Sequence, residues 1–144
     1  MKHQTIDQLQ AIAEIHTEPL RPAMTRAQRL ERWAELLEAN PLRCLGTLSG
    51  TEHQSRAVRQ NMRSPGSPIA IAFEDPLLRA EGLENDTYGE AKRFFEVTDW
   101  QLHDIVCHCH VGETMSAARA ARYVRAVVGG RFSFFTRWRA AIFS

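Results

Sequence analysis

A recurrent helix-capping pattern constrains this chain more than any other feature of its sequence. In a capping box, a Ser or Thr is followed three residues later by Glu or Gln, and the two side chains satisfy each other's backbone amides at a helix start. The pattern begins at five positions, Thr5, Thr25, Thr51, Thr87 and Thr98. Because each one precedes a segment that can be helical, the sequence predicts an all-α protein.

Apolar residues follow these signals at helical spacing. After the second box, the stripe consists of Leu30, Trp33, Ala34 and Leu37. After the last box, it consists of Leu102, Ile105, Val106 and Cys109. Most stripes are only two or three turns long, which predicts about seven short helices packed orthogonally in one small domain. The expected core is Trp33, Leu37, Phe73, Leu77, Phe94, Phe95, Leu102, Ile105, Val106 and Val124.

Further helix boundaries come from proline and glycine. Ser67 and Asp75 each precede a proline, the pattern of an N-cap with proline at the first helical position. The helix after Thr98 is expected to reach about residue 110, with Gly112 closing it. A helix over about 116–128 is expected to end at Gly129, whereas residues 42–50 are predicted to be a short strand or irregular.

The length of 144 residues fits one domain, predicted over 1–130, with an internal hinge near 63–68 and a separate tail over 131–144. A hydrophobic content of 44% and a charged content of 24% are ordinary for a soluble domain. The beginning of the chain lacks the apolar region of a secretory signal, and no apolar run is long enough to span a bilayer. We therefore expect a cytoplasmic protein whose three cysteines stay reduced.

The most unusual string of residues is His103-Asp-Ile-Val-Cys-His-Cys-His110. On a continuous helix, one face would carry His103, Cys107 and His110. Imidazole nitrogen and thiolate sulfur are donor types that zinc prefers. These three span about 10 Å along the helix axis, too far for all of them to reach one ion. A zinc- or thiol-dependent protein is thus an alternative hypothesis, and zinc is not favoured. The favoured interpretation is a central helix contacted on two sides.

A helix-turn-helix that binds nucleic acid is a second alternative, because an arginine-bearing helix near 116–128 follows the histidine-rich one. Arg119, Arg122 and Arg125 could contact phosphates. Bulky His108 and charged Glu113 are unsuited to the positions that they would take in that motif. Residues 74–104 also carry nine acids against three bases, which would repel DNA. Nucleic acid is therefore not the expected partner.

The tail over 131–144 holds five of the chain's twelve aromatic residues. As a helix it would present one arc, expected to contact a partner, made of Phe132, Phe135, Trp138, Arg139 and Ile142. A protein partner or a second copy of the chain fits this arc best, and a membrane surface is an alternative. Because the common catalytic motifs are missing, no catalytic residue is assigned, and a small helical binding or regulatory module is favoured over an enzyme.

Overall fold

The computed structural model describes residues 23–48, 50–107 and 114–130. The capping box at Thr5, the tail over 131–144, Cys109 and His110 lie outside these ranges. Within them the chain forms seven α-helices, one 3₁₀ turn and two strands, so the predicted mostly helical class is confirmed. In chain order the elements are α2 (Arg26–Glu38), β1 (Cys44–Gly46), η1 (Thr51–His53), α3 (Arg56–Gln60), α4 (Pro68–Glu74), α5 (Pro76–Ala80), α6 (Tyr88–Phe95), α7 (Asp99–Val106), β2 (Thr114–Ser116) and α8 (Ala117–Gly129).

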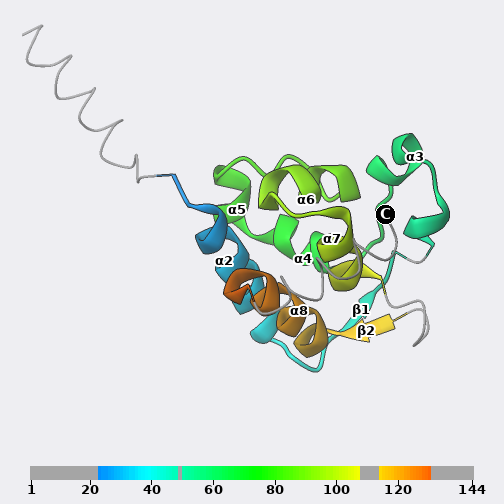
Figure 1. Ribbon diagram of the computed structural model, residues 1–144. Coiled ribbons are helices and arrows are strands. Elements are labelled where there is room, and N and C mark those ends of the chain that lie inside the picture. Colours follow the sequence, from blue (N-terminus) through cyan, green and yellow to red (C-terminus); the bar gives the residue numbers. More distant parts are fainter. Residues whose placement is uncertain (1–22, 49, 108–113, 131–144) are drawn as a thin grey trace, which may run out of the picture.

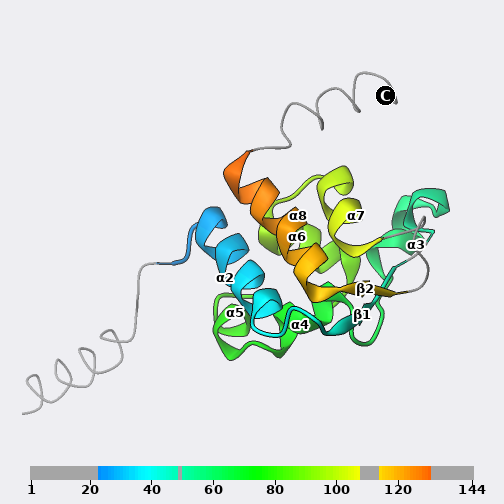
Figure 2. The same ribbon diagram turned by 90° about the horizontal axis from the view of Figure 1, so that it is seen from below.

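The two longest described helices, α2 and α8, lie side by side in both ribbon views and run antiparallel (Figures 1 and 2). Helices α4, α5, α6 and α7 gather beside this pair, and the short β1–β2 ribbon lies at one end of it. The strands are antiparallel, with Leu45 opposite Met115. Helix α3 stands at the edge of the molecule in both views. This placement separates α3 from the main core.

Helix α2 illustrates how its sequence dictates its position. Thr25 and Gln28 form the predicted capping box, with hydrogen bonds of 3.2 and 2.9 Å between side chains and backbone amides. The predicted stripe faces inward, and Trp33 is fully buried. Its indole stacks on Phe95 with ring centroids 4.2 Å apart, and its Nε1 donates to the carbonyl of Pro68 at 2.8 Å. Trp33 thereby joins α2 to α6 and to the start of α4.

The predicted core is confirmed for Trp33, Leu37, Phe94, Phe95, Leu102, Ile105, Val106 and Val124, all of which are buried. The prediction for Leu77 is wrong, because Leu78 is fully buried while Leu77 is half-buried. Asp75 caps α5 and is anchored by Arg32, and this anchoring turns Leu78 to the inside. Phe73 is likewise only half-buried and packs at the edge of the core.

The capping signals differ in outcome. Thr98 forms a complete box, and Ser67 and Asp75 cap α4 and α5, each followed by the predicted proline. Thr87 caps α6, but the side chain of Glu90 binds the amide of Glu84 instead of completing the box. The prediction that Thr51 caps a helix is wrong. Thr51 is instead the buried first residue of the 3₁₀ turn η1.

Helix α7 ends earlier than predicted. Its last residue is Val106, and Cys107 is already extended, with φ −118° and ψ 128°. The carbonyl of Val106, which a longer helix would use internally, accepts instead from the amide of Leu48 at 3.0 Å. This hydrogen bond ties the end of α7 to the segment after β1. The prediction of one helix through residue 110 is therefore wrong.

Candidate functional site

Residues 50–62, which contain η1 and α3, form a small lobe, here called the α3 lobe. None of the five residues of α3 is buried, so apolar packing contributes little to holding it in place. Polar contacts attach the lobe instead. The amide of Tyr88 donates to the carbonyl of Met62 at 2.8 Å, and Thr51 and Arg59 reach side chains of α7. The lobe thus lies against α6 and α7 through these polar groups, and Met62 at its end packs against the core.

Gly89 allows α6 to approach the lobe closely. A Cβ atom at this position would lie 2.9 Å from the carbonyl oxygen of Gln60 and 3.0 Å from its Cβ. The carbonyl oxygen of Gln60 belongs to the backbone, so it can make room only if the backbone of α3 moves. The absence of a side chain at position 89 therefore sets the distance between α3 and α6.

We expect Gly89→Ala to lower the free energy of unfolding by about 1–2 kcal/mol, because the added methyl overpacks this contact. At an unconstrained helical position, the same change would raise stability by about 1 kcal/mol. The sign of the change in a urea titration followed by circular dichroism therefore tests the contact. A stabilised variant would show that α3 does not pack tightly on Gly89.

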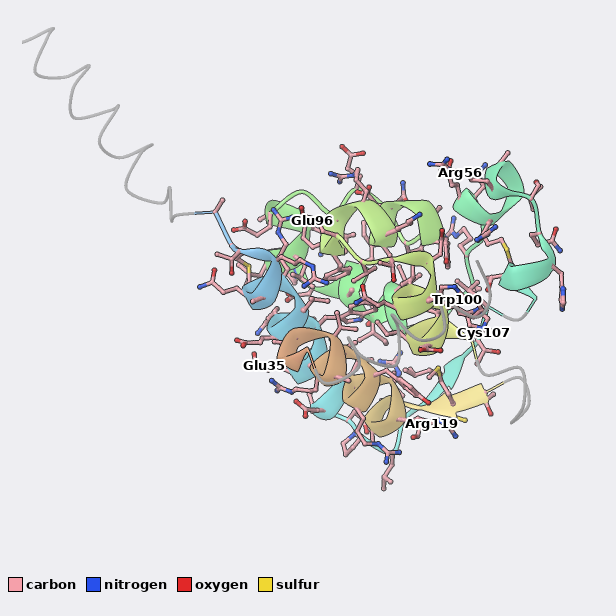
Figure 3. All side chains as sticks on the ribbon, in the orientation of Figure 1. Glu35, Arg56, Glu96, Trp100, Cys107 and Arg119 are labelled. Atoms are coloured by element: carbon pink, nitrogen blue, oxygen red, sulfur yellow. The ribbon has the colours of Figure 1, made fainter. Side chains whose placement is uncertain are left out.

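A pocket of about 400 Å³ lies between the α3 lobe and the start of α6 and α7. It is lined by Thr51, Arg59, Tyr88, Thr98, Asp99, Trp100 and His103. Trp100 is labelled on α7 in Figure 3 and has 37% of its surface exposed. Hydrogen-bonding groups from four elements thus converge beside a partly exposed aromatic ring.

Asp99 is the centre of a hydrogen-bond network in this pocket. Its carboxylate accepts from Lys92 Nζ at 3.0 Å and from the Tyr88 hydroxyl at 3.0 Å, and Arg59 Nη1 lies 3.6 Å away. Burial alone would raise the pKa of Asp99, but the hydrogen bonds from Lys92 and Tyr88 and the nearby positive charges lower it. Burial and the neighbouring Asp99 carboxylate raise the pKa of Tyr88. At neutral pH, Asp99 is an anion and Tyr88 a neutral donor.

His103 is positioned from two sides. Its Nδ1 lies 2.8 Å from the hydroxyl oxygen of Thr51, across 52 positions of sequence. The ring of Trp100 packs edge-on against the imidazole, with centroids 6.0 Å apart and an interplanar angle of 82°. The burial of Thr51 in η1 therefore serves to orient His103.

Arg59 is the least compensated cation of the pocket. Its Nη2 donates to the carbonyl of Gln54 at 3.3 Å, and its Nη1 is too far from Asp99 for a hydrogen bond. Its Nε is shielded from solvent and has no hydrogen-bond acceptor among the described residues. The Arg59 guanidinium is thus held by Gln54, by its ion pair with Asp99 and by an interaction with the Tyr88 hydroxyl.

The structure describes two of the three residues predicted to bind metal. His103 lines the pocket, whereas Cys107 is buried beyond the end of α7, with 4% of its surface exposed. His110 lies outside the described residues. Because α7 ends at Val106, the shared helical face on which the metal hypothesis depended is not formed. Across the described ranges, no group of three or more His, Cys, Asp or Glu side chains could hold a metal ion.

The connection between α7 and α8 differs from a helix-turn-helix. That motif joins its helices by a turn of three or four residues. Here α7 ends at Val106 and α8 begins at Ala117, and the intervening segment contains β2, which pairs with β1. Arg125 of α8 forms an ion pair with Glu38 of α2 at 2.6 Å. The connection between α7 and α8 is therefore not the short turn that the helix-turn-helix alternative requires. The predicted contact residues of the tail lie outside the described ranges, namely Phe132, Phe135, Trp138, Arg139 and Ile142.

Most pocket residues were missed by sequence reasoning. Thr51, Arg59, Tyr88 and Asp99 are distant in sequence and belong to no shared motif. One signal was available: the capping box at Thr98 places Asp99 and Trp100 in the first turn of a helix, beside His103. Nothing in the local sequence indicates that the α3 lobe lies against that turn.

Comparisons with known proteins give no identity: no protein-family model, curated protein sequence or solved structure matches this chain. Among the described helices, none is long and apolar enough to cross a membrane.

Proposed function

We propose that this chain is a small helical binding module that recognises a protein partner through the pocket beneath the α3 lobe. The observation that carries the proposal is the convergence of Thr51 from η1, Arg59 from α3, and Asp99 and His103 from α7 around one pocket. Concave sites with a few convergent polar groups are the usual places for recognition. The partly exposed ring of Trp100 adds the residue type that most often dominates binding energy at protein interfaces.

The arrangement supports binding over turnover. The Asp99 carboxylate is held by hydrogen bonds from Lys92 and Tyr88, so it is a poor base. The raised pKa of Tyr88 keeps its proton in place at neutral pH. A general acid or base works best with a pKa near the working pH, and these two groups are displaced from it. They are suited to fixing the shape and charge of a site.

The proposed setting is the cytoplasm. In that reducing compartment the thiols of Cys44 and Cys107 would stay free. Residues 131–144 are proposed as a second contact surface, for a protein partner or another copy of the chain.

The test is a nuclear magnetic resonance titration of the ¹⁵N-labelled full-length protein with blocked tripeptides. The peptides are acetyl-Gly-X-Gly-amide, in which X is Glu, Gln, Lys, Phe or Leu. We expect at least one peptide to bind in the millimolar range and to shift the amides of Thr51, Arg59, Asp99 and Trp100 selectively. If none of the peptides shifts these amides, the proposed function is wrong.

We expect Trp100→Ala to weaken binding of the active peptide at least about fivefold, since truncating an interface aromatic commonly costs 1 kcal/mol or more. Leu42→Ala is the matched control, because Leu42 is 91% exposed and does not line the pocket. Its affinity should be unchanged. Equal affinities for the two variants in the same titration would contradict a role for Trp100.

A further inference from the structure

Two cations lie beside the Asp99 carboxylate, Arg59 in the pocket lining and Lys92 behind it. Lys92 lies within hydrogen-bond distance of Asp99, at 3.0 Å, and compensates its charge. Arg59 is then a second cation beside the same carboxylate, at the longer distance of 3.6 Å. The group of Lys92, Arg59 and Asp99 therefore carries one net positive charge. This excess favours an anionic ligand.

The environment of the Arg59 guanidinium indicates where that anion would bind. The Arg59 side chain is 24% exposed, so its charge is partly removed from water. The planar guanidinium favours an acceptor group with two oxygens in one plane.

We infer that the pocket takes the carboxylate of a peptide, bound by Arg59, with the adjoining apolar atoms of the peptide against Trp100; this inference rests on the proposed function. A carboxylate suits the site better than a phosphate, because Asp99 would repel a doubly charged group more strongly. The single excess charge of the Lys92, Arg59 and Asp99 group also matches a singly charged ligand. Two sources share this chemistry, an acidic side chain and the end of a polypeptide chain.

The experiment uses the same full-length protein and compares peptides that differ in one group. The Glu tripeptide is compared with its Gln counterpart, and acetyl-Gly-Gly-Phe with a free carboxyl end is compared with its amide. We expect at least one acid to bind about tenfold or more tightly than its neutral counterpart, as expected for a hydrogen bond to a charged group. The Glu pair identifies a side-chain source, and the Phe pair identifies a chain end.

Two arginine variants locate the interaction. Arg59→Gln should weaken binding of the preferred acid about tenfold or more and abolish its preference over the neutral peptide. Arg56→Gln is the matched control, because Arg56 is exposed on the same helix and does not line the pocket (Figure 3). It should retain the affinity of the original protein. Arg59→Lys should give an intermediate affinity, since lysine keeps the charge but loses the planar pair of donors.

The outcomes distinguish this inference from the proposed function. If neutral or lysine peptides shift the pocket amides as strongly as the acids, the pocket binds peptides but the carboxylate inference is wrong. If acids bind with equal affinity to the original protein and to Arg59→Gln, the role of Arg59 is wrong. The Glu–Gln and acid–amide comparisons need no variant, so the inference can be tested even if Arg59→Gln disturbs the α3 lobe.

Discussion

Replacing Trp33 with alanine is expected to lower the free energy of unfolding by about 3–5 kcal/mol. A small domain is commonly stable by only about 5–15 kcal/mol, so this loss would leave the variant near its unfolding threshold. The size of the effect follows from position: Trp33 is fully buried, stacks on Phe95 and donates a hydrogen bond to Pro68. Removing the indole leaves a cavity where α2, α4 and α6 meet. Urea unfolding followed by circular dichroism measures the loss.

Two further variants separate the causes. Trp33→Phe keeps an aromatic ring but leaves the Pro68 carbonyl without its donor, which should cost about 1–3 kcal/mol. Trp100→Ala removes the same side chain from a partly exposed position and should change stability by about 0.5 kcal/mol or less. If Trp33→Ala were as mild as Trp100→Ala, the core around α2 would not be organised as described.

Helix positions were predictable where the evidence was local. The stripe of α2 and the caps at Thr25 and Thr98 depend on residues within one or two turns, and the structure confirms them. The choice between Leu77 and Leu78 was not local. It depends on Asp75, whose carboxylate is held by Arg32 from a different helix. The spacing of apolar residues alone could not predict which side of the short helix α5 faces the core.

The end of α7 and the pocket were also beyond local evidence. In the sequence, the apolar residues of this segment keep helical spacing beyond Val106. The carbonyl of Val106, however, accepts a hydrogen bond from the amide of Leu48, and a longer helix would need that carbonyl for its own backbone. Thr51 fits a capping box in sequence, yet its hydroxyl is next to His103. In both cases a contact between distant segments overrides a valid local signal. The metal prediction likewise placed His103 and Cys107 on one continuous helix, whereas α7 ends before Cys107.

The second large effect is expected at Asp75, which combines two roles. Its carboxylate forms two hydrogen bonds with Arg32, at 2.9 and 3.0 Å, and it caps α5 by accepting from the amide of Leu78 at 3.2 Å. Asp75→Ala removes both roles and should cost about 3 kcal/mol. Asp75→Asn keeps a capping oxygen but loses the charge, and should cost about 2 kcal/mol. Glu74→Gln, at an exposed ion pair of 3.9 Å, is the control and should cost less than about 0.5 kcal/mol.

The pH dependence of stability provides an independent test of the same contact. The hydrogen bonds from Arg32 lower the pKa of Asp75, although burial opposes them. The unfolded chain therefore binds a proton at this residue at higher pH than the folded chain does. The stabilisation by Asp75 is complete above its ordinary pKa of about 3.9 and is lost as pH falls through the folded value.

Urea titrations between neutral pH and about pH 3 should therefore show a smaller loss of stability for Asp75→Asn than for the original protein. The slope of unfolding free energy against pH should not disappear in this variant, because the pKa values of Glu90 and Asp99 are lowered as well. An Asp75→Asn variant with an unchanged slope would show that the carboxylate does not titrate against Arg32. Asp75→Asn could also lose stability at neutral pH and keep the slope of the original protein. That result would mean that the loss comes from the capping geometry and that the charge contributes nothing.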